Sequence, residues 1–203
     1  MPFAAVPERL ALVNVDLQNF FVESAPQGHD IVGRVNRLAA ELRRAGVLIV
    51  HTSHVLRADG SNVGVLGELV PSVRTAGFLF EGSATAALHS DLVVEPVDVS
   101  LKKPRFGAFH GTDLELILRQ RGIDTIAISG ITTDVCCDTT AREANARDFR
   151  VFFLKDATAA NEETMEEAMA VHAATLKTIG LFSEVITTAE LLARIDLDSE
   201  RRS

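Results

Sequence analysis

The sequence predicts an α/β fold with three layers, in which a six-stranded, mostly parallel, Rossmann-like sheet has helices on both faces. Short β-branched apolar runs alternate with longer amphipathic segments, as is typical of βα units that build a parallel sheet. Six such runs are enough for a doubly wound sheet. The 203 residues are 47% hydrophobic and 24% charged, which suffices for one sizeable core. We therefore expect residues 1–203 to form one domain.

The expected strands are short runs rich in Val, Ile and Leu, several of them bounded by Gly or charged residues. In chain order they are Leu10–Val15, Val47–Thr52, Asp98–Leu101, Thr125–Ser129, Arg150–Leu154 and Glu184–Thr187.

The expected helices lie between these strands and have one apolar face each. In chain order they are His29–Ala45, Thr112–Arg121, Asp134–Arg147, Glu162–Ile179 and Ala189–Ile195. The first shows the pattern clearly, because its apolar residues recur every three to four positions, at Ile31, Val35, Leu38 and Leu42. Three helices are followed by a glycine that suits a left-handed cap, namely Gly46, Gly122 and Gly180.

The stretch from 54 to 96 has no clear periodicity and is interrupted by several glycines. We expect a long excursion with one short helix near Ala84–His89. Excursions of this length often cover an active site.

The charge balance argues against nucleic acid as a partner. Twenty Lys and Arg against 28 Asp and Glu give a formal charge of −8, so broad attraction for phosphate is lacking. The N-terminus has no cationic stretch before its apolar residues, and Glu8, Arg9 and Asp16 interrupt any signal peptide or membrane span. We expect a cytoplasmic protein that does not associate with membranes.

The two cysteines, Cys136 and Cys137, are adjacent. Their Cα atoms are about 3.8 Å apart, which is shorter than the usual disulfide span. A structural zinc site normally uses four spaced ligands, which two neighbouring thiols cannot supply. Each cysteine is therefore interpreted either as a buried structural residue or as a reactive thiol.

Chemistry-bearing residues follow three of the expected strands: Asp16, the pair Lys102 and Lys103, and the string GITTDVCC. Ligands of open parallel sheets bind beyond the carboxyl ends of the strands, so these residues could converge. Cys136 would lie in the first turn of a helix, where free N–H groups favour a thiolate and could hold an oxyanion. Rapid alkylation at neutral pH is the expected consequence. Each residue also has a structural interpretation, as a buried small hydrophobe, a backbone cap or a solvated turn.

Three strings together resemble the isochorismatase-like cysteine hydrolases: VDLQNFF at 15–21, KPRFGAFHGTDL at 103–114 and GITTDVCCDTTAREA at 130–144. The resemblance runs from about residue 8 to 195. It implies that Cys136 is the nucleophile, Asp16 the general acid/base and Lys103 the residue that orients and electrostatically supports both. Cys137 would be a bystander.

The resemblance also implies a non-proline cis peptide between Ile131 and Thr132, with the N–H groups of Thr132 and Cys136 binding the oxyanion. Gln18 matches the family's D-x-Q-N string, and Phe20 or Phe21 would help to form the pocket wall. Like its relatives, the protein would act on a small-molecule substrate, and we expect a homo-oligomer, either a dimer or a tetramer.

Two departures from the family narrow the reaction. The nicotinamidase branch has an Asp-x-His motif after the second strand, whereas this chain has His51-Thr-Ser-His54, so we expect no metal and no other cofactor. A strand would point these two His rings to opposite faces. The isochorismatase proper lacks the nucleophilic Cys, so Cys136 argues for C–N cleavage.

Among enzymes that cleave C–N bonds, those acting on ureido or carbamoyl compounds such as biuret have motifs that these strings resemble most. Ureidoacrylate, N-carbamoyl amino acids, maleamate, nicotinamide-type and other carboxamides stay open. The available partners for a substrate carboxylate are His54, Arg57, Arg74 and Arg105.

Other classes of protein fit the sequence less well than a cysteine hydrolase does. A catalytically silent, small-molecule-binding member of the family is the main alternative. A Rossmann nucleotide-binding protein lacks support because no strand is followed by G-x-G-x-x-G, and redox catalysis lacks a C-x-x-C motif.

Overall fold

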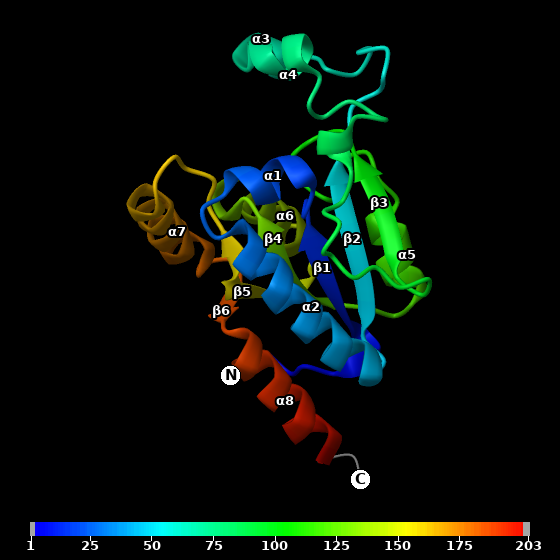
Figure 1. Cartoon of the computed structure of the whole chain (residues 1–203). Helices are drawn as coiled ribbons and strands as arrows, with labels where there is room; N and C mark the ends of the chain where they lie inside the picture. Colours follow the sequence, from blue (N-terminus) through cyan, green and yellow to red (C-terminus); the bar gives the residue numbers. More distant parts are fainter. Residues whose placement is uncertain (1–2, 201–203) are drawn as a thin grey trace.

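The computed structural model describes the backbone of residues 3–200 and the side chains of residues 3–195. Its centre is a six-stranded sheet in the order β3-β2-β1-β4-β5-β6 (Figure 1). Every neighbouring pair of strands is parallel. The expected α/β class is confirmed, with an all-parallel sheet in place of a mostly parallel one. The strand order reverses at β1, which makes the edge between β1 and β4 the topological switch point.

All six predicted strands are present; β1 has the predicted ends, and each of the other five is shifted at one end or both. They are β1 (Leu10–Val15), β2 (Leu48–His54), β3 (Val99–Lys103), β4 (Thr125–Ile131), β5 (Arg150–Ala159) and β6 (Glu184–Ile186). Strand β3 continues through Lys102 and Lys103 because it pairs with β2 up to His54. Ladder hydrogen bonds from a neighbouring strand thus override the polar character of the two lysines.

The helices are α1 (Asn19–Ser24), α2 (Gly28–Arg44), α3 (Leu66–Leu69), α4 (Pro71–Ala76), α5 (Leu114–Gln120), α6 (Asp138–Asn145), α7 (Met165–Ile179) and α8 (Thr188–Glu200). Two short 3₁₀ turns are η1 (Pro7–Arg9) and η2 (Ala84–Ala86), and a π-helical turn, η3 (Thr133–Cys137), precedes α6. The expected helix at Ala84–His89 is only the turn η2. Gly46 and Gly122 have the left-handed conformation expected of caps, whereas Gly180, with φ of −59°, does not.

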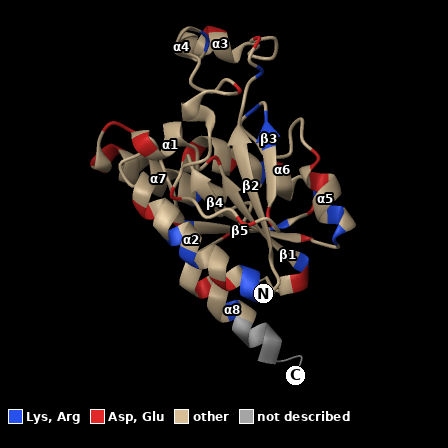
Figure 2. Ribbon diagram, turned by 45° about the vertical axis from the view of Figure 1, so that its right-hand side comes forward, with Lys and Arg blue, Asp and Glu red and all other residues tan. Residues whose placement is uncertain are grey.

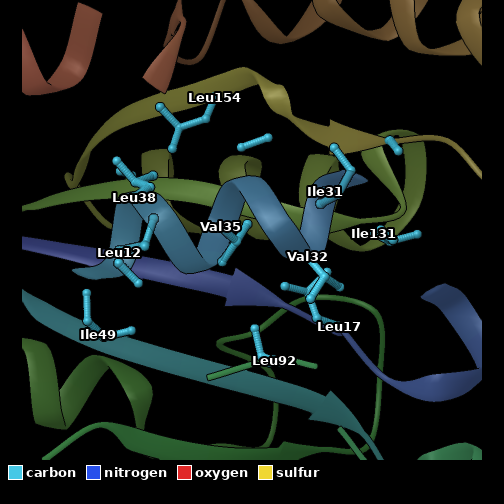
Figure 3. Packing of buried hydrophobic residues seen from close by; sticks show 14 of the residues in the cluster. Leu12, Leu17, Ile31, Val32, Val35, Leu38, Ile49, Leu92, Ile131 and Leu154 are labelled. Carbon is cyan, nitrogen blue, oxygen red and sulfur yellow. The ribbon is translucent and has the colours of Figure 1, made fainter. Parts of the chain in front are cut away.

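Two apolar layers cover the sheet. On one face, α2 and α8 pack on the strands, and the predicted α2 residues Ile31, Val35, Leu38 and Leu42 are all buried there. Figure 3 shows the first three of them beside the strands. On the other face, residues of α5, α6 and α7 pack against alternate residues of the same strands. Positions of Lys, Arg, Asp and Glu are numerous on the helices, whereas the three central strands β1, β2 and β4 contain none of these residues (Figure 2).

Between β2 and β3 the chain forms an arm, residues 56–80, that bears α3 and α4 and stands beyond the carboxyl ends of these strands (Figure 1). Two backbone hydrogen bonds close its base, from Leu56 N to Leu79 O and from Glu81 N to Leu56 O, each 2.8 Å long. The ring of Phe78 stacks on Phe20 of α1, with 4.2 Å between the ring centroids. The arm therefore stands next to the switch point of the sheet.

Candidate active site

Asp16 follows the last residue of β1 and is fully buried. Its φ of 52° lies in the left-handed region, which Asp adopts more readily than most side chains. The backbone N–H of Asp16 donates to Thr52 O at 3.2 Å, and the Thr52 hydroxyl donates to Oδ1 at 2.9 Å. Strand β2 thus holds both the backbone and the carboxylate of Asp16.

Lys103 is the last residue of β3 and is also fully buried. Its Nζ lies 2.6 Å from Asp16 Oδ2 and donates to the carbonyl oxygens of Arg105 at 3.0 Å and Phe106 at 2.7 Å. Burial by itself would lower the pKa of Lys103, but the Asp16 carboxylate, through its charge and its hydrogen bond with the ammonium group, outweighs burial and raises that pKa. Lys103 is therefore a charged, fully partnered lysine.

Cys136 lies in η3, directly after β4, and only 2% of it is exposed. The peptide bond between Ile131 and Thr132 is cis, as the resemblance implies. Just before it, Gly130 has φ of 123°, and a Cβ there would lie 2.0 Å from Val15 O. Only glycine allows β4 to pass so close to β1. This close approach brings η3 to the end of the strand that presents Asp16.

The thiol environment differs from the expectation. Burial raises the pKa of Cys136 to about 12, and the Asp16 carboxylate adds to this increase, while Lys103 lowers it only in part. The expectation of a lowered Cys136 pKa is wrong, because a helix start favours a thiolate where the thiol is partly exposed, and this thiol is buried. In the free protein Cys136 is a neutral thiol that hydrogen-bonds with the Asp16 carboxylate.

Alkylation of Cys136 by iodoacetamide should accordingly be slow at pH 7 and should accelerate about tenfold per pH unit up to pH 10, because the thiolate is the reactive form. Cys136 and Cys137 share one tryptic peptide, residues 122–142, so the Cys137→Ala variant is the protein to label. Its labelling rate is followed by mass spectrometry. A rate that is fast and constant above pH 6 would mean that the thiolate already exists in the free enzyme.

Gln18 does not line the cavity that opens between the sheet and the arm. Its side-chain amide donates to His54 O at 3.1 Å and to Ala86 O at 2.7 Å, and its Oε1 accepts from His54 N at 2.7 Å. This predicted pocket residue therefore ties the end of β2 to η2, next to the site. The His54 ring itself lies in the cavity.

A cavity of about 560 Å³ opens between the sheet and the arm. Of the predicted site residues, the cavity is lined by Cys136, Thr132, Phe20, Phe21 and His54. Ile131 is not part of the lining, and neither is Arg105, whose guanidinium donates to Asn62 O and Pro104 O. The rest of the wall is mainly apolar and comes largely from the arm.

The two histidines of β2 do not form a common metal site. His51 lies 3.1 Å from Asp98 Oδ2 through Nε2 and 3.3 Å from the Asn14 amide through Nδ1, so both of its nitrogens are engaged away from the cavity. Burial and the nearby Lys103 lower the pKa of His54 to about 4. His54 alone does not provide the donor set that the nicotinamidase branch uses.

Within the described side chains, one cluster has metal-ligating types close together, namely Glu23, His29 and His89. The Asp91 N–H donates to His89 Nδ1 at 3.2 Å, so Nε2 bears the proton and faces Glu23 Oε1 at 3.0 Å. A metal at Nε2 would require the opposite tautomer. The cluster is therefore a hydrogen-bonded structural contact.

Sequence reasoning missed several residues of this site. Thr52, which holds Asp16, is an ordinary strand residue by pattern, and the arm residues have no periodicity to reveal them. Asp134 and Asn161 also line the cavity. Asp134 stood inside the GITTDVCC string and could have been included, because it precedes Cys136 by two residues.

Comparison with known proteins shows which family the chain belongs to. The model of the isochorismatase domain matches residues 10–190. The chain belongs to the isochorismatase family. A cysteine hydrolase from Pseudomonas syringae pv. phaseolicola has a structure that superimposes with a TM-score of 0.89, at 33% identity and over 96% of both chains.

Two curated relatives of this isochorismatase-family hydrolase are a nicotinamidase and an amidohydrolase by name. Nicotinamidase 3 of Arabidopsis thaliana is 32% identical over 160 residues, which cover 78% of this chain and 77% of the relative. The ureidoacrylate amidohydrolase of Methylobacterium radiotolerans is 28% identical over 190 residues, with 77% and 69% covered. None of the helices described for the hydrolase has the length and apolar character needed to cross a membrane.

Proposed function

We propose that this isochorismatase-family hydrolase cleaves the C–N bond of a small amide, ureido or carbamoyl compound through a covalent intermediate on Cys136. One observation is the main support. A thiol, a carboxylate and a lysine from the ends of three parallel strands lie together, buried, at the switch point of the sheet, and the thiol faces a cavity.

In the first half-reaction Asp16 takes the proton of the Cys136 thiol, and the sulfur forms a bond to the carbonyl carbon of the substrate. This transfer is necessary because the pKa of the free thiol is raised to about 12. The electrons of the carbonyl π bond move to its oxygen, where the backbone N–H groups of Thr132 and Cys136 stabilise the oxyanion.

The tetrahedral intermediate collapses when Asp16 returns its proton to the nitrogen, the C–N bond breaks and ammonia or a small amine leaves. In the second half-reaction Asp16 deprotonates a water molecule, whose oxygen attacks the thioester or thiocarbamate carbon. The C–S bond then breaks, the sulfur regains a proton from Asp16, and the acid product leaves. Throughout, Lys103 and Thr52 keep the carboxylate in place.

A panel of amides and ureido compounds, assayed for ammonia or amine release with and without EDTA, tests this proposal. We expect turnover that EDTA does not change, because the mechanism uses no metal. Quenching the Cys137→Ala variant with substrate should give a mass adduct on peptide 122–142. If the folded protein turns over no compound and forms no adduct, a catalytically silent binding protein becomes the better account.

A further inference from the structure

The wall of the cavity is apolar where a substrate's far end would lie. The arm contributes Leu66, Val70, Val73 and Phe78, and Phe106 faces them from the loop after β3. Phe78 is fixed by its stack on Phe20, and Phe106 meets the His54 ring edge-on at 5.7 Å. Such a wall favours aryl or branched alkyl groups, because moving an apolar group from water to an apolar surface lowers its free energy.

Three residues that line the cavity each have a buried polar atom without a hydrogen-bond partner: His54 Nε2, Thr132 Oγ1 and Asp134 Oδ1. The His54 ring is neutral at pH 7 because burial and Lys103 lower its pKa to about 4. A neutral imidazole keeps one nitrogen that accepts a hydrogen bond, and the carboxylate oxygen of Asp134 accepts as well. Both side chains can therefore accept from an N–H donor on the substrate.

The arginines predicted as partners for a substrate carboxylate bind other groups of the protein. Arg105 donates to two backbone carbonyls and lies against Gly64. Arg74 lies over Gly67 and donates to Gly64 O, while Arg57 pairs with Asp59 at the surface. No Lys or Arg of the described residues lines the cavity. A carboxylate placed there would lose its water without gaining a cation and would face Asp134.

We infer, on the basis of the proposed function, that the substrate is an uncharged amide or urea with an aryl or branched alkyl far end. The N–H groups of its reacting end donate to the unpartnered acceptors of the cavity. Carboxylate-bearing amides, the class to which ureidoacrylate belongs, are poor substrates of this chain.

Matched pairs with the same reacting group test the inference. One pair is 4-methylpentanamide against succinamate, and another is (3-methylbutan-2-yl)urea against N-carbamoylalanine; an isopropyl group replaces the carboxylate in each. We expect kcat/KM to be higher for the neutral member by on the order of 10²-fold. A preference for the acids would overturn the inference and leave the proposed function intact, whereas a folded enzyme inactive on all four compounds and on the whole panel of amides and ureido compounds would remove both.

A pair of variants tests whether the cavity causes the preference. Val70 lines the cavity with 40% exposure, so Val70→Arg adds a cation at its rim, and Leu69→Arg adds the same charge on α3 outside it, at a residue 77% exposed. Val70→Arg should shift the neutral-to-acid ratio toward the acids by about tenfold or more, and Leu69→Arg should leave it unchanged. Equal ratios in both variants and the wild type would contradict the assignment of this cavity.

Discussion

Replacing Cys136 by alanine should reduce kcat on the order of 10⁴-fold or more, because the covalent route then has no nucleophile. Cys137→Ala is the matched control, since it removes the same atoms one residue away. Cys137 Sγ lies 3.9 Å from Ser129 O, and its side chain is part of the core under α6. This second variant should retain nearly full kcat and lose roughly 1–2 kcal/mol of unfolding free energy.

The measurement is steady-state ammonia or amine release together with denaturant unfolding of all three proteins. Retained turnover in Cys136→Ala with loss in Cys137→Ala would reverse the assignment of the nucleophile. Equal loss in both variants, without a matching loss of fold, would mean that η3 as a whole rather than one thiol is needed for activity.

Asp16→Asn is expected to lower kcat by roughly 10²–10⁴-fold, as is usual when a positioned general acid/base is removed. Asparagine keeps the oxygen that accepts from Thr52, but it can neither take the thiol proton nor return one to the leaving nitrogen. The change also leaves the buried Lys103 without its counter-charge, so the variant should lose roughly 3–5 kcal/mol of unfolding free energy.

Because stability and activity fall together in Asp16→Asn, a second buried aspartate serves as the control. Asp98 has a side chain only 1% exposed and pairs with Arg43 at 2.6 Å, outside the cavity. Asp98→Asn should show a comparable loss of unfolding free energy with kcat nearly unchanged. If both variants lost activity in proportion to stability, Asp16 would have only a structural role, and the proton-transfer steps assigned to it would fall.

Local patterns were sufficient to predict the six strands and the long helices. The apolar runs of the strands reflect burial on both faces of the sheet, as β1 and β4 show. The recurrence of Ile31, Val35, Leu38 and Leu42 every three to four residues reflects burial of one helix face, and the structure buries that face. Element ends were less accurate, since β2 and β3 extend each other by pairing up to His54 and Lys103. The helices α3 and α4 were not predicted, because four to six residues are too few to show a period.

The class of fold, the family resemblance and the position of Asp16, Lys103 and Cys136 at the ends of three strands could be inferred from the chain without coordinates. These inferences needed only hydrophobic period, motif spacing and the rule that parallel strands present their carboxyl ends at one edge. The folded arrangement was needed to establish the protonation of Cys136, the hydrogen bonds of Arg105 and the apolar wall of the cavity. Those properties depend on which distant residues exclude water from a group, and burial of that kind leaves no local trace in the chain.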